Sequence, residues 1–242
     1  MTDQPTHPAI LGIVPARGGS KGISRKNIRS LAGKPLLAYT AAAALQSKWL
    51  ARVLLSTDDP EIAETGRAFG LEAPFLRPAE LALDSTPMLD VVLHAIDWAQ
   101  GRGERYAAIC LLQPTSPLRS VETIDRCISA LWEKDVDSVI SVRPVPPEYN
   151  PHWVYFQQTS GRFVLSTGER DPISSRQLLP AAYHRDGSVF VVRTDVLTGQ
   201  QSLYGATTIG IMSPECEAFD LDTEDQWQSL ERKLSGISAG RS

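Results

Sequence analysis

Short apolar runs alternate with amphipathic stretches along the first 142 residues. The runs are rich in Val, Ile and Leu and have the length of buried parallel strands. In the clearest amphipathic stretch, residues 88–100, Leu89, Val92, Leu93 and Ile96 recur at helical spacing. The pattern predicts strands at 9–13, 52–57, 106–112 and 138–142, and helices at 36–45, 60–70, 88–100 and 122–132.

The alternation breaks after Pro144. Residues 144–185 contain several prolines and two short stretches of strand character, but no helical pattern. Strand character returns at 188–192 and 207–211, and a last helix is predicted at 223–234. Alternating strands and helices are typical of a mostly parallel sheet with helices on both faces. We therefore predict an α/β domain formed by residues 1–143 and 186–242, with an inserted arm at 144–185.

Composition narrows the possible partners. The formal net charge is −4 and no lysine-rich run occurs, which argues against nucleic-acid binding. No apolar run reaches the roughly 20 residues of a membrane span, and residues 1–8 lack the pattern of a signal peptide. The three cysteines are far apart, so we expect free thiols and no zinc site. A cytoplasmic protein that binds neither nucleic acid nor membrane is expected.

A glycine-rich, basic segment follows the first predicted strand. Residues 15–22 read PARGGSKG, and Arg25, Lys26 and Asn27 come soon after. Glycines let the backbone approach a ligand closely, and backbone N–H groups with Arg and Lys suit a chain of phosphates. The spacing is neither a Walker A loop nor GxGxxG. We predict a phosphate-binding loop, with a solvated surface loop as the alternative.

A second polar segment, residues 113–119 (QPTSPLR), follows the predicted strand at 106–112. Ligands of open α/β sheets bind beyond the carboxyl ends of the strands. Gln113 offers a donor and an acceptor, which suits a base edge or a sugar hydroxyl. The alternative is a proline-stiffened turn that only positions the next helix.

Two carboxylates precede the last predicted helix. Asp220 and Asp222 lie two residues apart, so on an extended segment they point to the same side. Mg²⁺ is usually held by one or two carboxylates plus substrate phosphates. Alternatively, Asp222 only caps the helix while Asp220 is solvated. Asp58 and Asp59 form a rival pair, although Pro60 explains Asp59 as a helix cap.

Together these segments resemble the CMP-sialic acid synthetases, the acylneuraminate cytidylyltransferases. Residues 13–22 with Lys26 and Asn27 are similar to the family's nucleotide signature, and 77–82 (RPAELA), 113–119 and 220–224 (DLDTE) match further segments in order. The resemblance implies a Rossmann-like, three-layer fold of the nucleotide-diphospho-sugar transferase type, with a small arm exchanged across a homodimer. It also implies transfer of CMP from CTP to the anomeric hydroxyl of an acidic nine-carbon sugar, with release of pyrophosphate.

Site residues are carried over by the same resemblance. The implied catalytic residues are Arg17, Lys26 and Asp222, and the implied ligands of Mg²⁺ or Mn²⁺ are Asp220 and Asp222. Arg17, Ser20 and Lys26 would hold the triphosphate. The full implied nucleotide-binding set is Arg17, Gly18, Ser20, Lys26, Asn27, Arg77, Thr86 and Gln113.

The segments that the resemblance implies for sugar binding depart from the family pattern. The implied sugar-binding residues are Gln113, Arg176, Tyr183 and Asp186. The segment 150–153 (NPHW) lacks the lysine expected after His-Pro, and Asp186-Gly187 stands where Asn-Gly is common. A carboxylate at 186 would repel an acidic sugar unless it turns away or pairs with Arg185. The sugar therefore stays open among N-acetylneuraminic, legionaminic and pseudaminic acids.

Other interpretations remain. His152 and His184 are candidate general bases, with a structural role as the alternative for each. The chain could activate a 3-deoxy-octulosonic acid, or it could be a non-catalytic nucleotide-binding regulator of the same fold. The presence of both Asp220 and Asp222 argues against the regulator. Trp153, Tyr155 and Phe156 make the arm too apolar for a free loop, which predicts packing against a second subunit.

Overall fold

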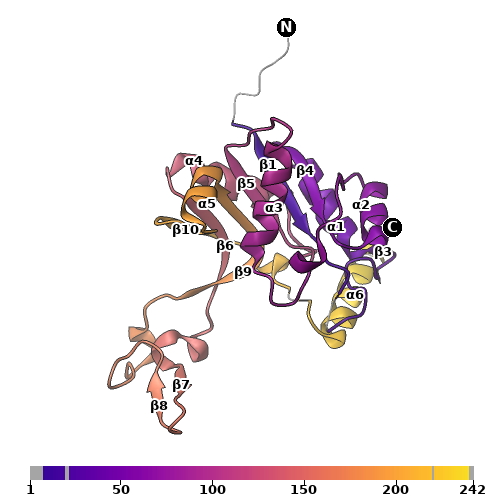
Figure 1. The fold of residues 1–242 in the computed structure, drawn as a ribbon. Coiled ribbons are helices and arrows are strands. Elements are labelled where there is room, and N and C mark those ends of the chain that lie inside the picture. The colour runs from indigo at the N-terminus through magenta and orange to yellow at the C-terminus, as the bar shows by residue number, and fades with distance from the viewer. Residues whose placement is uncertain (1–7, 20–21, 220, 240–242) are drawn as a thin grey trace. The chain divides into compact units, whose positions relative to one another are not determined.

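A computed structural model describes residues 8–19, 22–219 and 221–239, and its centre is a six-stranded sheet in the order β10-β6-β9-β5-β1-β4. β1 runs parallel to both of its neighbours, β4 and β5. The strands are β1 (Ile10–Pro15), β4 (Leu50–Ser56), β5 (Ala108–Leu112), β6 (Ser138–Pro144), β9 (Tyr183–Arg193) and β10 (Thr208–Met212). The predicted mostly parallel α/β fold is confirmed (Figure 1).

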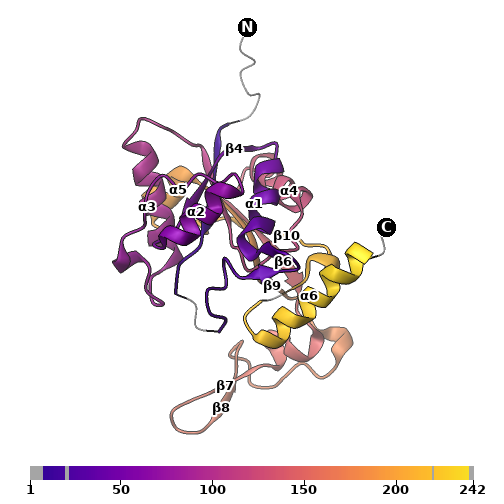
Figure 2. The ribbon, with the colours of Figure 1, turned by 90° about the vertical axis from the view of Figure 1, so that its right-hand side faces the viewer.

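Helices cover both faces of the sheet. On one face pack α1 (Leu36–Gln46), α2 (Pro60–Ala68) and α4 (Val121–Glu133), and on the other α3 (Met88–Gln100) and α5 (Thr194–Gln200) (Figure 2). β1 shows why the sequence requires two layers. Ile10 and Val14 belong to one apolar core, whereas Leu11 and Ile13 belong to the other. Because side chains alternate along a strand, a wholly apolar strand must be covered on both sides.

Four helices or strands differ from the sequence prediction. β9 pairs with β5 in antiparallel register, Leu112 opposite Val189. The pattern of a short apolar run does not carry strand direction, so this pairing was not predictable from it. The seven-residue α5 was missed because it buries only Val196 and Leu197. The two-residue strands β2 (Ser30–Leu31) and β3 (Lys34–Pro35) are too short to leave a pattern.

The last helix, α6 (Glu224–Ala239), packs on the segment that follows the glycine-rich loop. Trp227 and Leu230 are buried against Ile23, Leu31 and Leu36. Arg29 donates to both carboxylate oxygens of Glu224, at 2.6 and 2.5 Å. These contacts fix the start of α6, and with it Asp222, beside the glycine-rich loop.

The chain divides into two compact units, residues 1–141 with 187–242, and residues 142–186. The second unit covers the segment in which the helix–strand alternation breaks. It contains an antiparallel hairpin of β7 (Tyr155–Gln157) and β8 (Phe163–Leu165), together with three short 3₁₀ turns, η2 (Pro147–Tyr149), η3 (Pro151–Trp153) and η4 (Arg176–Leu178). Across both units, none of the helices in the described ranges combines the length and hydropathy that a membrane crossing requires.

Polar contacts join the first and last residues of the second unit. Asp186 has a fully buried side chain, and its Oδ2 lies 3.5 Å from Arg143 Nε. The backbone N–H of Val145 donates to the carbonyl of Ala182 at 2.8 Å. The charge of Asp186 is therefore countered by Arg143, a residue that the sequence did not single out. The sugar-binding role of Asp186 stays a prediction.

Candidate nucleotide-binding site

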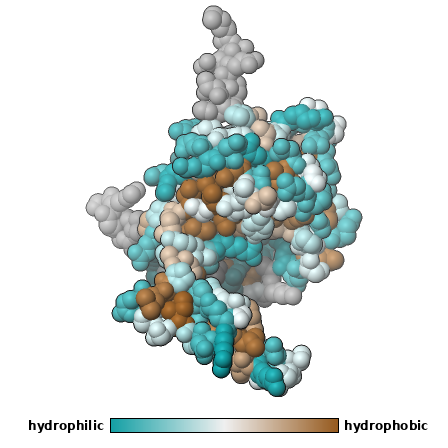
Figure 3. Space-filling view, turned by 90° about the vertical axis from the view of Figure 1, so that its left-hand side faces the viewer, coloured by the Kyte–Doolittle hydropathy of each residue, from teal (hydrophilic) through white to brown (hydrophobic). Residues whose placement is uncertain are grey.

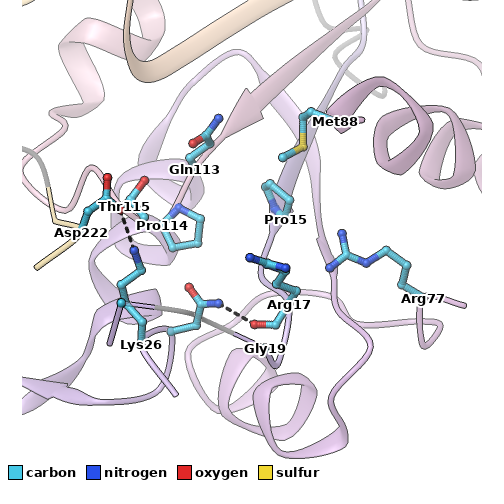
Figure 4. A pocket seen from close by; sticks show the side chains of 12 residues that line it. Pro15, Arg17, Gly19, Lys26, Arg77, Met88, Gln113, Pro114, Thr115 and Asp222 are labelled. Atoms are coloured by element: carbon cyan, nitrogen blue, oxygen red, sulfur yellow. Dashed lines mark hydrogen bonds and ion pairs between the residues drawn. The ribbon is translucent and has the colours of Figure 1, made fainter. Parts of the chain in front are cut away.

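A cavity of about 390 Å³ lies beyond the carboxyl ends of β1 and β5. Its size falls within the usual range of small-molecule sites. Figure 4 shows Arg17 and Arg77 reaching into the cavity from one side, with Lys26 and Asp222 on the other. The lining residues are Pro15, Arg17, Gly19, Gly22, Lys26, Asn27, Arg77, Met88, Gln113, Pro114, Thr115 and Asp222.

The glycine-rich loop is held by side chains from outside it. The backbone N–H of Gly18 donates to Asp58 Oδ1 at 3.0 Å. The buried Asn27 donates its side-chain N–H to the carbonyl of Arg17 at 2.9 Å. Asn27 therefore holds the backbone of the loop at Arg17 and also lines the cavity. Fixing the backbone in this way lowers the entropy lost when a ligand binds.

Arg17 projects into the cavity and forms an ion pair with Asp84, Nη1 to Oδ1. Both side chains are partly exposed, 34% and 41%. An exposed pair of this kind contributes little to stability. A polyphosphate that enters the cavity can therefore take Asp84's place on the guanidinium at small cost.

Arg77 is the most deeply buried cation of the site. Its Nε and Nη2 are buried and have no hydrogen-bond partner among the described residues, and Nη2 lies 3.7 Å from Asp58 Oδ1. Burial lowers the pKa of Arg77, and the nearby Asp58 partly opposes that shift. A guanidinium nevertheless stays charged in proteins. Buried donors without partners are costly, so Arg77 is suited to a polar ligand that completes its hydrogen bonds.

Lys26 joins the glycine-rich loop region to the start of α6. Its ammonium donates to the carbonyl of Leu221 at 2.8 Å and to Asp222 Oδ1 at 3.0 Å. The cap of α6 is formed instead by Thr223 and Gln226, since Gln226 N donates to Thr223 Oγ1 while Gln226 Oε1 accepts from the N–H groups of Asp222 and Thr223. The alternative in which Asp222 only caps the helix is therefore wrong, and its carboxylate lines the cavity.

Gly22 allows the loop and the Asp222 backbone to approach closely. A Cβ at this position would lie 2.3 Å from the carbonyl oxygen of Asp222, a distance that only a backbone shift can relieve. We expect Gly22→Ala to lower kcat/KM by roughly tenfold or more, because small displacements of site groups are costly in catalysis. The measurement is steady-state kinetics on the folded variant.

A glycine far from the cavity provides the control for Gly22→Ala. Nothing lies within 4 Å of a Cβ built on Gly199 in α5, so Gly199→Ala should keep wild-type kinetics. Equal activity of Gly22→Ala and wild type would mean that the close contact with Asp222 does not set the site's geometry.

Most of the nucleotide-binding and catalytic residues that the resemblance implies converge on this cavity, and some do not. Arg17, Lys26, Asn27, Arg77, Gln113 and Asp222 line it, whereas Gly18 and Thr86 are absent from the lining. Thr86 donates its hydroxyl to the carbonyl of Glu80 at 3.1 Å.

Ser20 and Asp220 lie outside the described residues. Arg176 and Tyr183 are exposed residues of the second unit, and their sugar-binding role stays a prediction.

Three contributors were missed by the sequence reasoning. Asp84 pairs with Arg17, Met88 lines the cavity, and Asp58, considered only as a metal ligand, accepts from Gly18 instead. Asp59 caps α2, accepting from the N–H groups of Glu61 and Ile62. The rival metal pair thus already has structural roles. No local signal marks Asp84, because its partner lies 67 positions earlier in the chain.

Comparison with known proteins identifies the family of the chain. A family model described as cytidylyltransferase matches residues 11–161, which is more than half of the chain. The chain belongs to the cytidylyltransferase family. The match to this family includes the glycine-rich loop, Arg77 and Gln113, but ends before Asp222.

Individual relatives extend the similarity over nearly the whole cytidylyltransferase chain. The CMP-N,N'-diacetyllegionaminic acid synthase of Legionella pneumophila is 32% identical over 93% of this chain and 96% of its own. The pseudaminic acid cytidylyltransferase of Campylobacter jejuni is 31% identical over 88% and 90%. A structure of CMP:2-keto-3-deoxy-manno-octonic acid synthetase complexed with CTP has a TM-score of 0.70 at 17% identity, covering 95% and 99%. That structure supports the fold assignment.

Proposed function

We propose that the protein transfers CMP from CTP to the anomeric hydroxyl of a nonulosonic acid and releases pyrophosphate. The observation that carries the proposal is the convergence of Arg17, Lys26 and Arg77 with Gln113 in one cavity of a cytidylyltransferase. Three cations suit a ligand with several negative charges, and the side-chain amide of Gln113 suits a base edge or a sugar hydroxyl. The names of the relatives support a nine-carbon acidic sugar as the acceptor.

In the proposed reaction the anomeric oxygen bonds to the α-phosphorus while the bond from that phosphorus to the pyrophosphate oxygen breaks. The anomeric hydroxyl gives up its proton to solvent, and pyrophosphate leaves with the electron pair of the broken bond. Arg17 and Lys26 are suited to counter the charge that collects on the phosphate oxygens. Arg77 is suited to a polar oxygen of the base or ribose, because it lines the cavity and its buried Nε and Nη2 have no hydrogen-bond partner among the described residues.

A magnesium ion is part of the proposal. Asp222 is a carboxylate in the wall of the cavity that lies opposite the two arginines, and such a hard oxygen donor fits Mg²⁺. Asp222, together with Asp220, would hold the ion, with Mn²⁺ as a substitute. When bound, the cation neutralises phosphate charge at short range. The protein's own part is to hold Asp222 in place through Lys26 and the docked α6.

The proposed acceptor is tested by competition between sugars. Pyrophosphate release should be measured with CTP, UTP, ATP and GTP, each against legionaminic, pseudaminic, N-acetylneuraminic and 3-deoxy-octulosonic acids. The proposal expects CTP with a nine-carbon acid to be the fastest combination. A preference for the eight-carbon acid would favour the other sugar nucleotidyltransferase, and the absence of turnover with every combination would favour the regulator.

We also propose that the second unit supports a homodimer. Phe156 and Phe163 of its hairpin are each 63% exposed and Leu178 is 67% exposed. Exposing large apolar side chains to water is unfavourable, and such surfaces often mark sites of protein–protein contact. Figure 3 shows apolar side chains of this unit at the surface. A second copy of the chain is the proposed cover, since two-fold dimers are the commonest symmetric assemblies.

Light scattering at micromolar concentration tests the dimer. We expect twice the mass of one chain for the wild type, and a shift toward the single-chain mass for Phe156→Ser with Phe163→Ser. Arg162→Ala, at an exposed neighbouring position, is the control and should keep the larger mass. A wild type that is monomeric and fully active would contradict the proposal.

A further inference from the structure

Arg119 is a buried cation whose role neither the cavity nor the reaction explains. Only 4% of the residue is exposed, and it does not line the cavity. Its Nη2 donates to the carbonyl of Gln113 at 2.5 Å and its Nε to the carbonyl of Ser188 at 2.8 Å. Nε also lies 3.2 Å from Ser188 Oγ, and Nη1 donates to Thr40 Oγ1 at 3.3 Å. One guanidinium thus ties together the end of β5, the strand β9 and the helix α1.

The position of these contacts in the sheet is informative. The last residue pair between β5 and β9 is Leu112 with Val189. Continuing the antiparallel register, the next pair would be Gln113 with Ser188, the two residues whose carbonyl oxygens accept from Arg119. The guanidinium therefore takes the place of the next rung of the ladder and holds the two strands at a set spacing where the sheet ends.

Gln113 lines the cavity immediately beyond this point. A Cβ on Gly187, which has a φ of +73°, would lie 3.8 Å from Gln113 Oε1, so the side-chain amide lies beside the β9 backbone. Any change in the spacing of β5 and β9 would move this amide. The fixed, planar donors of arginine can span two carbonyls, whereas the single ammonium of lysine cannot do so in the same geometry.

We propose that Arg119 is a positioning residue that sets the place of Gln113 in the cavity through the carbonyls of Gln113 and Ser188. Arg119 does not touch the substrate itself. The inference rests on the proposed function only in that Gln113 contacts the nucleotide or the sugar. It predicts a kinetic coupling between Arg119 and Gln113 that a generally structural arginine would lack.

The test is a double-mutant cycle with a matched control. We expect Arg119→Lys to lower kcat/KM roughly tenfold, but to cause no further loss in a Gln113→Ala background, because its effect acts through Gln113. The control is Arg193→Lys at the other end of β9, where Arg193 donates to the carbonyl of Val136 at 2.8 Å. It should lower the thermal midpoint comparably without changing kcat/KM.

Each other outcome would overturn the inference. Wild-type kcat/KM in Arg119→Lys would do so, as would losses that multiply in the double variant, or equal kinetic losses in Arg119→Lys and Arg193→Lys. If Arg119→Lys does not fold, Thr40→Val removes the Nη1 acceptor and should give a smaller loss that also vanishes without the Gln113 amide. If the wild type transfers CMP to no acid, the proposed function fails separately. The same cycle is then read from the dissociation constant of CTP.

Discussion

Asp222→Asn is expected to lower kcat by roughly 10²- to 10³-fold, equivalent to about three to four kcal/mol of transition-state stabilisation. The asparagine amide can still accept the hydrogen bond from Lys26, so the start of α6 should stay in place. The substitution removes the negative charge that is proposed to hold a divalent cation beside the phosphates. Single-turnover kinetics in excess Mg²⁺ would measure the loss, and Mn²⁺ should restore part of it.

The structure sharpens the control for this prediction. Asp225 lies in the first turn of the same helix but not in the cavity, so Asp225→Asn should keep near-normal rates. Thr223 and Gln226 form the cap, so a loss of activity in Asp222→Asn cannot come from uncapping the helix. Near-normal rates in both Asp222→Asn and Asp220→Asn would mean that the metal assignment is wrong.

Arg17→Ala is expected to reduce kcat/KM for CTP by roughly 10²-fold or more, because a charge-assisted contact to a reacting phosphate contributes several kcal/mol. The guanidinium of Arg17 reaches into the cavity. Its partner Asp84 is partly exposed, so a phosphate can replace Asp84 in the ion pair. The fold should be little affected, since an exposed ion pair adds little stability. Steady-state kinetics over a range of CTP concentrations would separate weaker binding from slower turnover.

Arg25→Ala is the matched control for Arg17→Ala. Arg25 follows the same loop but pairs with Glu61 at 2.7 Å and is absent from the cavity wall. Its removal should leave kcat/KM near the wild-type value. Unchanged kinetics in Arg17→Ala at both low and saturating CTP would remove Arg17 from the site.

The sequence could predict those features that depend on local pattern. The cap by Asp59 and the bounds of the helix at 88–100 follow from neighbouring residues alone, and both agree with the structure. The position of the glycine-rich loop follows from one rule, that ligands bind beyond the carboxyl ends of parallel strands. The same rule brings Gln113 to the cavity, because β1 and β5 are neighbours.

Features that depend on contacts between distant residues could not be predicted in this way. The bond from Gly18 to Asp58 spans 40 positions and that from Arg119 to Ser188 spans 69. Asp58 was considered as a metal ligand because two adjacent carboxylates suggest a cation, whereas its oxygen accepts from the loop backbone. The strand at 188–192 was predicted, but its antiparallel direction was not, since the direction of a short apolar strand is set by its partner.

Product analysis tests the central claim most directly. Purified protein should be incubated with CTP, Mg²⁺ and a mixture of nonulosonic acids, and the products identified by mass spectrometry and phosphorus NMR. The account predicts a phosphodiester of CMP and one nine-carbon acid, formed in equal amount with pyrophosphate. Release of pyrophosphate or phosphate without a CMP-sugar, or no consumption of CTP with any of the acids, would contradict it.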